Sequence, residues 1–218
     1  MMEFSVDAAR WHSWASRLVE APTARMPLEL LALACELVPG GSVSLRLDPD
    51  EIHLSDPRPG LLEEEQTSTG AGPATMVGPT ALALPAADVA ATWPPLAAAV
   101  DGTGLRSCLA LALVVGEQRL GSLTLWAPGP EALEEPLPRV AGALAALASV
   151  VLALRRREQQ LEEAIASRDV LGQAKGILME RLGLDPDQAF ELLTAVSQRR
   201  NSKVRAIAEQ LTTAGELE

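Results

Sequence analysis

Hydrophobic residues recur every three or four positions in two segments near the N-terminus, residues 6–20 and 27–38. This spacing predicts two amphipathic helices. From residue 42 the period changes to two, which predicts strands, and a short polar helix is expected at 61–66. The predicted strands span residues 42–47, 51–55, 81–84, 105–115 and 119–126, with a turn at 48–51. Helices, then about five mostly antiparallel strands, then a closing helix indicate an α+β fold.

The helical pattern after the last strand runs from Pro138 to Gly183, more than forty residues. Such a length suggests a coiled coil, and apolar residues hold its heptad core positions through Ile165, apart from Glu158. We expect a parallel homodimer formed by these core residues: Val140, Leu144, Leu147, Val151, Leu154, Leu161 and Ile165. The alternative, a helix packed only on its own sheet, fits residues 140–154 but not the continuation through Leu161.

Residues 140–154 form an uncharged run followed by three arginines, the order of a stop-transfer helix. Fifteen helical residues span roughly 22 Å, short of the ~30 Å hydrocarbon core, so we expect a buried helix and no membrane contact. The two cysteines, Cys35 and Cys108, are far apart and no signal sequence precedes them. This pattern predicts reduced thiols and a cytoplasmic location.

Two further short helices are predicted near the C-terminus. Asp185 is placed as a cap, with Pro186 at the first helical position and Gln188 in position for a capping box. Three apolar stripes can close a small three-helix bundle, and they consist of Ile177, Leu178, Leu182, Ala189, Phe190, Leu193, Val196, Val204, Ile207, Ala208 and Leu211. Phe190, the only aromatic residue of this segment, is predicted to plug the core.

Charge is distributed unevenly along the chain, whose net charge is −11. Residues 1–154 carry 8 basic and 18 acidic groups, whereas residues 155–218 carry 10 and 11, including both lysines. The two histidines, His12 and His53, are isolated, and there is no metal-ligand spacing or phosphate-binding loop. We therefore expect no catalytic site, no metal site, no cofactor and no enzymatic activity.

The order of short landmarks between residues 25 and 150 resembles a GAF domain. They are residues 31–40, Gln66, residues 70–73, Asp88 with Trp93 and Pro94, residues 104–107 and residues 121–126. Thr67, Ala74 and Thr92 depart from the pattern of GAF domains in actinobacterial regulators, which have an aromatic residue, a cysteine and an arginine there. Two interpretations remain open: a scaffold and dimer platform, or a sensor of an unknown small ligand.

The C-terminal segment resembles an ANTAR domain across some fifty residues. The resemblance rests on residues 167–181, residues 187–193, and the positions Ser197, Asn201, Lys203, Ile207 and Ala208. It implies a three-helix RNA-binding module that prevents transcription termination by holding paired hairpins in nascent RNA. GAF domain, coiled coil and ANTAR domain in this order are familiar from actinobacterial proteins.

Basic and small residues of this segment are the candidate RNA-binding surface. They are Arg168, Gln173, Ala174, Lys175, Gly176, Arg199, Arg200, Lys203 and Arg205. Arginines can contact phosphates or stack on loop bases, and a glycine permits close approach of a partner. Two modules on one coil would bind a pair of hairpins bivalently. The alternatives are a dimeric adaptor that binds no RNA and, less favoured, a DNA-binding bundle.

The sequence thus predicts three parts. Residues 1–150 form a GAF-like sensory or dimerisation domain, residues 140–166 a coiled-coil connecting helix, and residues 157–218 the RNA-binding domain.

Overall fold

The computed structural model describes residues 7–47, 51–78 and 83–214. The chain divides into two compact units, residues 1–155 (the N-terminal unit) and residues 156–218 (the C-terminal unit). The division falls within one long helix, α7 (Leu137–Leu182), whose 46 residues confirm the predicted helix from Pro138 to Gly183.

The N-terminal unit contains a five-stranded antiparallel sheet with the strand order β2-β1-β5-β4-β3. The strands are β1 (Ser42–Leu47), β2 (Glu51–Leu54), β3 (Ala83–Ala86), β4 (Ser107–Val115) and β5 (Gln118–Ala127). The predicted α+β fold is confirmed, and each strand overlaps a predicted range. Residues 48–50 of the predicted turn and 81–82 of the third predicted strand lie outside the described residues.

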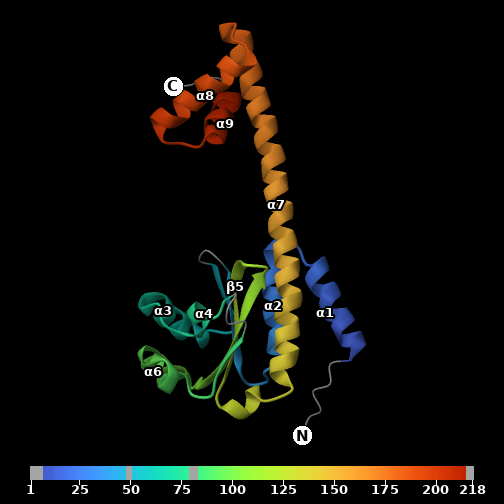
Figure 1. The fold of residues 1–218 in the computed structure, drawn as a ribbon, viewed down its shortest axis with the longest axis vertical. Helices are drawn as coiled ribbons and strands as arrows, with labels where there is room; N and C mark the ends of the chain where they lie inside the picture. The colour runs from blue at the N-terminus through green and yellow to red at the C-terminus, as the bar shows by residue number, and fades with distance from the viewer. Residues whose placement is uncertain (1–6, 48–50, 79–82, 215–218) are drawn as a thin grey trace. The chain divides into compact units, whose positions relative to one another are not determined.

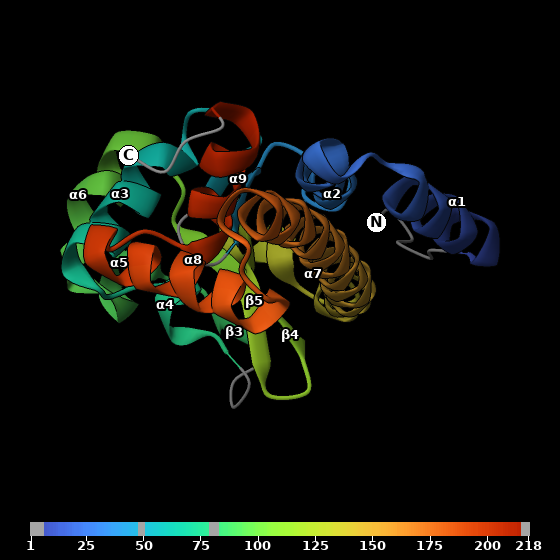
Figure 2. The ribbon, with the colours of Figure 1, turned by 90° about the horizontal axis from the view of Figure 1, so that it is seen from above.

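One face of this sheet is covered by α2 (Met26–Cys35) and the first part of α7, and α1 (Ala8–Glu20) packs on the outer side of α2 (Figures 1 and 2). Because strand side chains alternate between faces, Leu45, Leu123 and Leu125 point into this layer and are fully buried. The helix η1 (Thr23–Arg25) joins α1 to α2, and η3 (Pro130–Leu133) precedes α7. This layer holds the larger core of the unit.

Short helices cover the opposite face of the sheet. They are α3 (Pro59–Thr69), α4 (Pro73–Met76), α5 (Val89–Thr92), η2 (Pro94–Leu96) and α6 (Ala97–Thr103). Trp126 of β5 packs there in one cluster with Trp93 and Leu62. The polar helix predicted at 61–66 is thus longer than expected, and it ends where Gly70 adopts a left-handed conformation with φ 67°.

Helix α7 is the one helix among the described residues that is long and apolar enough, by length and composition, to cross a membrane. Its most apolar 18-residue window has a mean hydropathy of 2.0, and 44% of that window is buried inside the protein. Leu144 and Ala148 are fully buried against the sheet. The first part of α7 is therefore a core helix of the N-terminal unit.

The C-terminal unit contains the end of α7 together with α8 (Pro186–Arg200) and α9 (Val204–Ala214). The capping box predicted for Asp185 and Gln188 is present at the start of α8. A buried cluster fills the centre of the bundle, made of Ala174, Leu178, Ala189, Leu193, Val196, Ile207, Ala208 and Leu211. The predicted three-helix bundle is therefore confirmed.

Two predicted core residues of the bundle lie at its surface instead. Phe190 is 44% exposed and Leu182 is 58% exposed. Phe190 follows the buried Ala189 and is turned by about 100° from it, which places the ring at the flank of α8. Leu182 is the last residue of α7, directly before Gly183. The prediction that these two side chains fill the core is wrong.

Candidate nucleic-acid interface

Within the C-terminal unit, α7 has one buried and one exposed face. Ala174 and Leu178 belong to the core of the bundle. Arg168, Gly172 and Gly176 are spaced by four residues and are all exposed. At about 100° per residue, these three positions lie on the side of the helix opposite the core.

Neither glycine on this face is required by the packing of the chain. A Cβ atom added at Gly172 or Gly176 would meet no atom within 4 Å, and neither residue has a positive φ. A glycine inside a helix costs about 1 kcal/mol relative to alanine. Two such glycines one turn apart leave a smooth strip of backbone that a partner can approach closely.

Polar and basic side chains flank this strip. Arg168 and Gln173 are exposed, whereas Lys175 is half-buried at the edge of the bundle. Asp169 and Glu180, also exposed, bring negative charge to the same helix. The positive charge on α7 is therefore confined to a few positions between acidic residues. A polyanion must place its phosphates at these positions to bind.

A second group of cations surrounds the joint between α8 and α9. Asn201 forms this joint in a left-handed conformation with φ 50°, which ends α8 directly after Arg199 and Arg200. Arg199 and Lys203 are exposed, and their side chains have no hydrogen bond or ion pair within the described part of the chain. These two side chains are available for phosphate contacts.

The other two cations at the joint have partners within the unit. Arg200 donates a hydrogen bond of 3.0 Å to Oε1 of Gln210, and Arg205 lies 2.8 Å from the carboxylate of Glu209. These contacts hold the two side chains along α9. Both bonds are exposed and can exchange for a ligand at small cost.

The predicted dimer contacts divide into two classes. Leu144 and Val151 are buried in the core of the N-terminal unit, and Val140 and Leu147 pack partly buried against that core. Leu154, Leu161 and Ile165 are 62%, 58% and 64% exposed. The assignment of Leu144 and Val151 to a dimer interface is wrong, because the sheet of the same chain already covers them.

Val150 is an exposed apolar residue of α7 that the sequence analysis did not include among the predicted dimer contacts. It is 52% exposed, three residues after Leu147 and four before Leu154. The exposed apolar residues of α7 in this stretch are therefore Val150, Leu154 and Leu161, with Leu147 partly buried at their edge; Val150 takes the place that was predicted for Val151. The signal was present in the sequence, but only the position of the sheet decides which stripe it covers.

A polar network lies beneath α3 in the N-terminal unit. Glu63, which is 2% exposed, accepts a hydrogen bond of 2.6 Å from Ser44 Oγ and one of 2.8 Å from Arg46. Arg46 also donates to Thr67 Oγ1 at 2.9 Å, and Trp126 Nε1 donates to Ser44 Oγ at 2.9 Å. The network joins β1, β5 and α3 around one buried carboxylate.

Several landmarks between residues 66 and 93 have structural roles. The Gln66 side chain accepts a hydrogen bond of 2.9 Å from the amide of Ala74. Gly72 has φ 149° and lies against Gln66, so a side chain there would collide with it. Asp88 caps α5 through the amide of Ala91. These residues hold the turns that follow and precede the short helices.

Residues 159–211 match the family model of the ANTAR domain. The C-terminal unit is an ANTAR domain. A curated relative, the aliphatic amidase regulator of Pseudomonas aeruginosa, is 34% identical over 58 residues. The match covers 27% of this chain and 30% of that regulator, so the chain spans less than a third of the relative.

Solved structures are similar to the chain at low sequence identity. A domain assigned to a two-component sensor histidine kinase of Sinorhizobium meliloti aligns with a TM-score of 0.50 and 15% identity, covering 65% of this chain and 98% of that one. The GAF domain of the cyanobacteriochrome TePixJ aligns with a TM-score of 0.46 and 16% identity, covering 62% and 92%. At such identities the likeness concerns the fold alone.

The ANTAR domain presents most of the predicted RNA-binding residues at its surface, with one correction. Arg168, Gln173, Gly176, Arg199, Arg200 and Lys203 are exposed, and Lys175 and Arg205 are half-buried. Ala174 is fully buried beneath Leu193 and Ile207 in the same cluster, so its side chain cannot contact RNA. Gly172 was missed as a functional candidate, although its spacing from Gly176 was visible in the sequence.

Proposed function

We propose that this protein is a regulator of transcription termination that binds paired hairpins in nascent RNA as a homodimer. The observation that carries the proposal is the exposed glycine strip of α7, Gly172 and Gly176, beside Arg168 and Lys175 in an ANTAR domain. The strip admits the RNA backbone, and the cations neutralise its phosphates.

Electrostatics set the expected character of this binding. Few cations per protomer give a modest affinity for one hairpin, which falls steeply with salt because counterions are released. In a dimer, the first ANTAR domain to bind would hold the second hairpin close to the second domain. The high effective concentration of that hairpin would raise the overall affinity without any new contact. A tandem-hairpin RNA is therefore the target that such a dimer fits.

A gel-shift titration with a tandem-hairpin RNA tests RNA binding. Replacing Arg168 and Lys175 together by alanine should weaken binding and lower the slope of log K against log salt by about 1 per lost phosphate contact. Arg139→Ala is the matched control, since Arg139 is a highly exposed cation of the N-terminal unit. Salt-insensitive binding, or equal affinities for the double variant and the control, would exclude the proposal and favour a dimeric adaptor that binds no RNA.

We propose that the dimer is a parallel coiled coil along the exposed part of α7. Leu154, Leu161 and Ile165 are large apolar side chains that the protomer leaves in solvent. Their spacing fits the seam of a two-stranded coil better than a solvated helix face. Leu161→Glu should convert the dimer to a monomer in sedimentation equilibrium at micromolar concentration, whereas Leu28→Glu, at another exposed leucine of the N-terminal unit, should not. A wild-type monomer at that concentration would contradict the proposed dimer.

Under the same proposal the protein is a regulator without enzymatic activity, located in the cytoplasm, where nascent bacterial RNA is found. The ANTAR domain and the name of the curated relative both support regulation as its role.

A further inference from the structure

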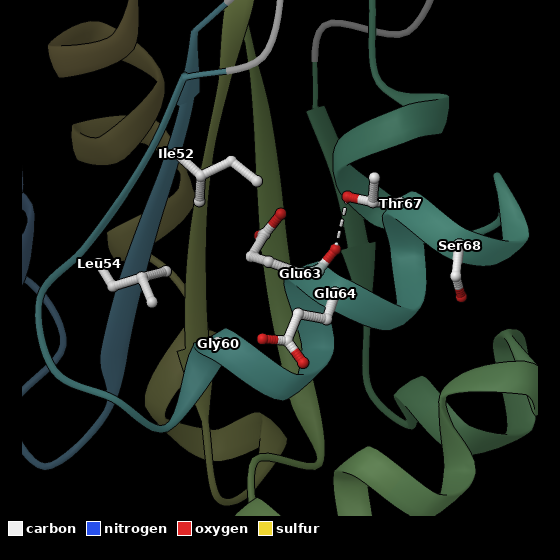
Figure 3. A pocket seen from close by; sticks show the side chains of 7 residues that line it. All are labelled: Ile52, Leu54, Gly60, Glu63, Glu64, Thr67 and Ser68. Atoms are coloured by element: carbon white, nitrogen blue, oxygen red, sulfur yellow. Dashed lines mark hydrogen bonds between the residues drawn. The ribbon is translucent and has the colours of Figure 1, made fainter.

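A groove lies between strand β2 and helix α3 of the N-terminal unit (Figure 3). Its volume is about 500 Å³, within the range of small-molecule sites. The lining comes from β2 and from one side of α3, and consists of Ile52, Leu54, Gly60, Glu63, Glu64, Thr67 and Ser68. Strand β2 is the edge of the sheet, so the groove opens to solvent.

The buried carboxylate that lines the groove, that of Glu63, is already hydrogen-bonded and paired with a cation. The carboxylate of Glu63 is held by Ser44 and by Arg46, whose guanidinium lies 2.8 Å away. The same guanidinium fixes Thr67 through a 2.9 Å hydrogen bond. Glu63 and Arg46 therefore neutralise each other, and neither is free to bind a ligand charge.

One carboxylate in the groove has no such partner. Glu64 is exposed, and its carboxylate makes no hydrogen bond or ion pair within the described part of the chain. It lies one residue beyond Glu63, and Figure 3 shows its carboxylate near Gly60. Ile52 and Leu54 supply apolar surface across from it, and Ile52 is 37% exposed.

Gly60 keeps this end of the groove open. It stands in the first turn of α3, and a Cβ atom there would meet only Leu54 Cδ1, at 3.5 Å. The fold thus tolerates a side chain at this position, although glycine is unfavourable within a helix. The packing of the chain therefore does not require a glycine here, and the space beside Gly60 belongs to the groove.

We infer that this groove binds a small amphipathic monocation, a primary amine with an apolar body. The apolar body would lie on Ile52 and Leu54 and over Gly60, and the ammonium group would pair with Glu64. The negative charge of residues 1–154, which carry 18 acidic and 8 basic groups, disfavours anions at the same place. This inference does not rest on the RNA binding proposed for the ANTAR domain.

Isothermal titration calorimetry of the full-length protein with n-hexylamine tests the site, with 1-hexanol and hexanoate as probes of equal length. We expect saturable binding of hexylamine, about three- to fivefold weaker binding of hexanol because one exposed ion pair is lost, and no binding of hexanoate. Hexanoate binding as tightly as hexylamine would overturn the inference, as would no binding of hexylamine.

Three variants locate the binding. Glu64→Gln should bring the hexylamine and hexanol affinities to within twofold of each other, and Gly60→Leu should abolish the binding of both by filling the groove. Glu65→Gln, a neighbouring acid that does not line the groove, should leave both affinities unchanged. Unchanged amine selectivity in Glu64→Gln would refute the role of this carboxylate. Unchanged binding in a Gly60→Leu protein with wild-type circular dichroism would place the amine elsewhere.

Discussion

The guanidinium of Arg46 lies 2.8 Å from the carboxylate of Glu63, and only 14% and 3% of the two side chains are exposed. Truncating one partner of such a pair leaves an uncompensated charge in a buried place. We expect Glu63→Ala to lower the free energy of unfolding by about 3–5 kcal/mol in a urea titration. Glu65→Ala, on the same helix, should change it by less than about 0.5 kcal/mol. Equal changes in the two variants would show that the buried pair contributes nothing specific.

Alanine at Gly172 or Gly176 separates stability from binding. Each substitution should raise the free energy of unfolding of the ANTAR domain by about 1 kcal/mol, because no atom occupies the space of the new methyl group. RNA affinity should fall at the same time, since the methyl groups obstruct the backbone strip. Gly142→Ala, another helical glycine of α7 with open space around it, is the control that should gain stability without losing affinity. A stabilised Gly176→Ala protein with full RNA affinity would remove the glycine strip from the interface.

We expect the protonation of Asp56 to lower the stability of the fold in acid. Its hydrogen bonds to Arg58 and to Ser42 Oγ lower the pKa of its carboxyl from 3.8 to about 2, against the opposing effect of burial. A carboxyl whose pKa is lower in the folded state than in the unfolded state stabilises the fold at any pH above its unfolded-state pKa. This stabilisation is lost as the pH falls from about 4 toward 2. Asp56→Asn should flatten the dependence of unfolding free energy on pH within that window. Asp101→Asn, at an exposed acid whose side chain makes no hydrogen bond among the described residues, should preserve that dependence.

The two cysteines should be poor nucleophiles in the folded protein. Burial raises the pKa of the Cys108 thiol to about 12, and burial also raises that of the half-buried Cys35. The reactive thiolate is therefore scarce at neutral pH. Mass spectrometry of an alkylation time course should show Cys35 labelled before Cys108, and both labelled rapidly in urea. Labelling of Cys108 at its urea rate under native conditions would contradict its position in the core.

Local patterns were sufficient for much of the fold. Alternation in β1 and β5 and the caps at Asp185 and Gln188 depend on neighbours within a few residues, and the structure has them where the sequence predicts. Which apolar stripe of a long helix is covered depends instead on the tertiary partner. This is why the periodicity of α7 could not distinguish Val151, which the sheet covers, from Val150, which it leaves exposed.

The candidate site shows the same division. Basic residues near Lys175 and Lys203 are exposed or half-buried as a polar sequence implies, but Ala174 is buried because it lies on the α8 side of the helix. Phe190 shows the limit of arguing from residue type: a lone aromatic was expected in the core, yet its angular position places it at the surface. The groove beside α3 had no sequence signal, since it depends on how β2 packs beside the helix that begins five positions after the strand ends.

The aromatic residues provide a way to follow the two units separately in the intact protein. All four tryptophans, Trp11, Trp14, Trp93 and Trp126, belong to the N-terminal unit, and the chain has no tyrosine. Trp126 touches the network of Ser44 and Glu63 directly through its indole N–H. Tryptophan emission therefore reports only on the sheet and the helices around it, whereas helical circular dichroism records both units. A difference between their melting curves would measure, without cutting the chain, whether the C-terminal unit unfolds on its own.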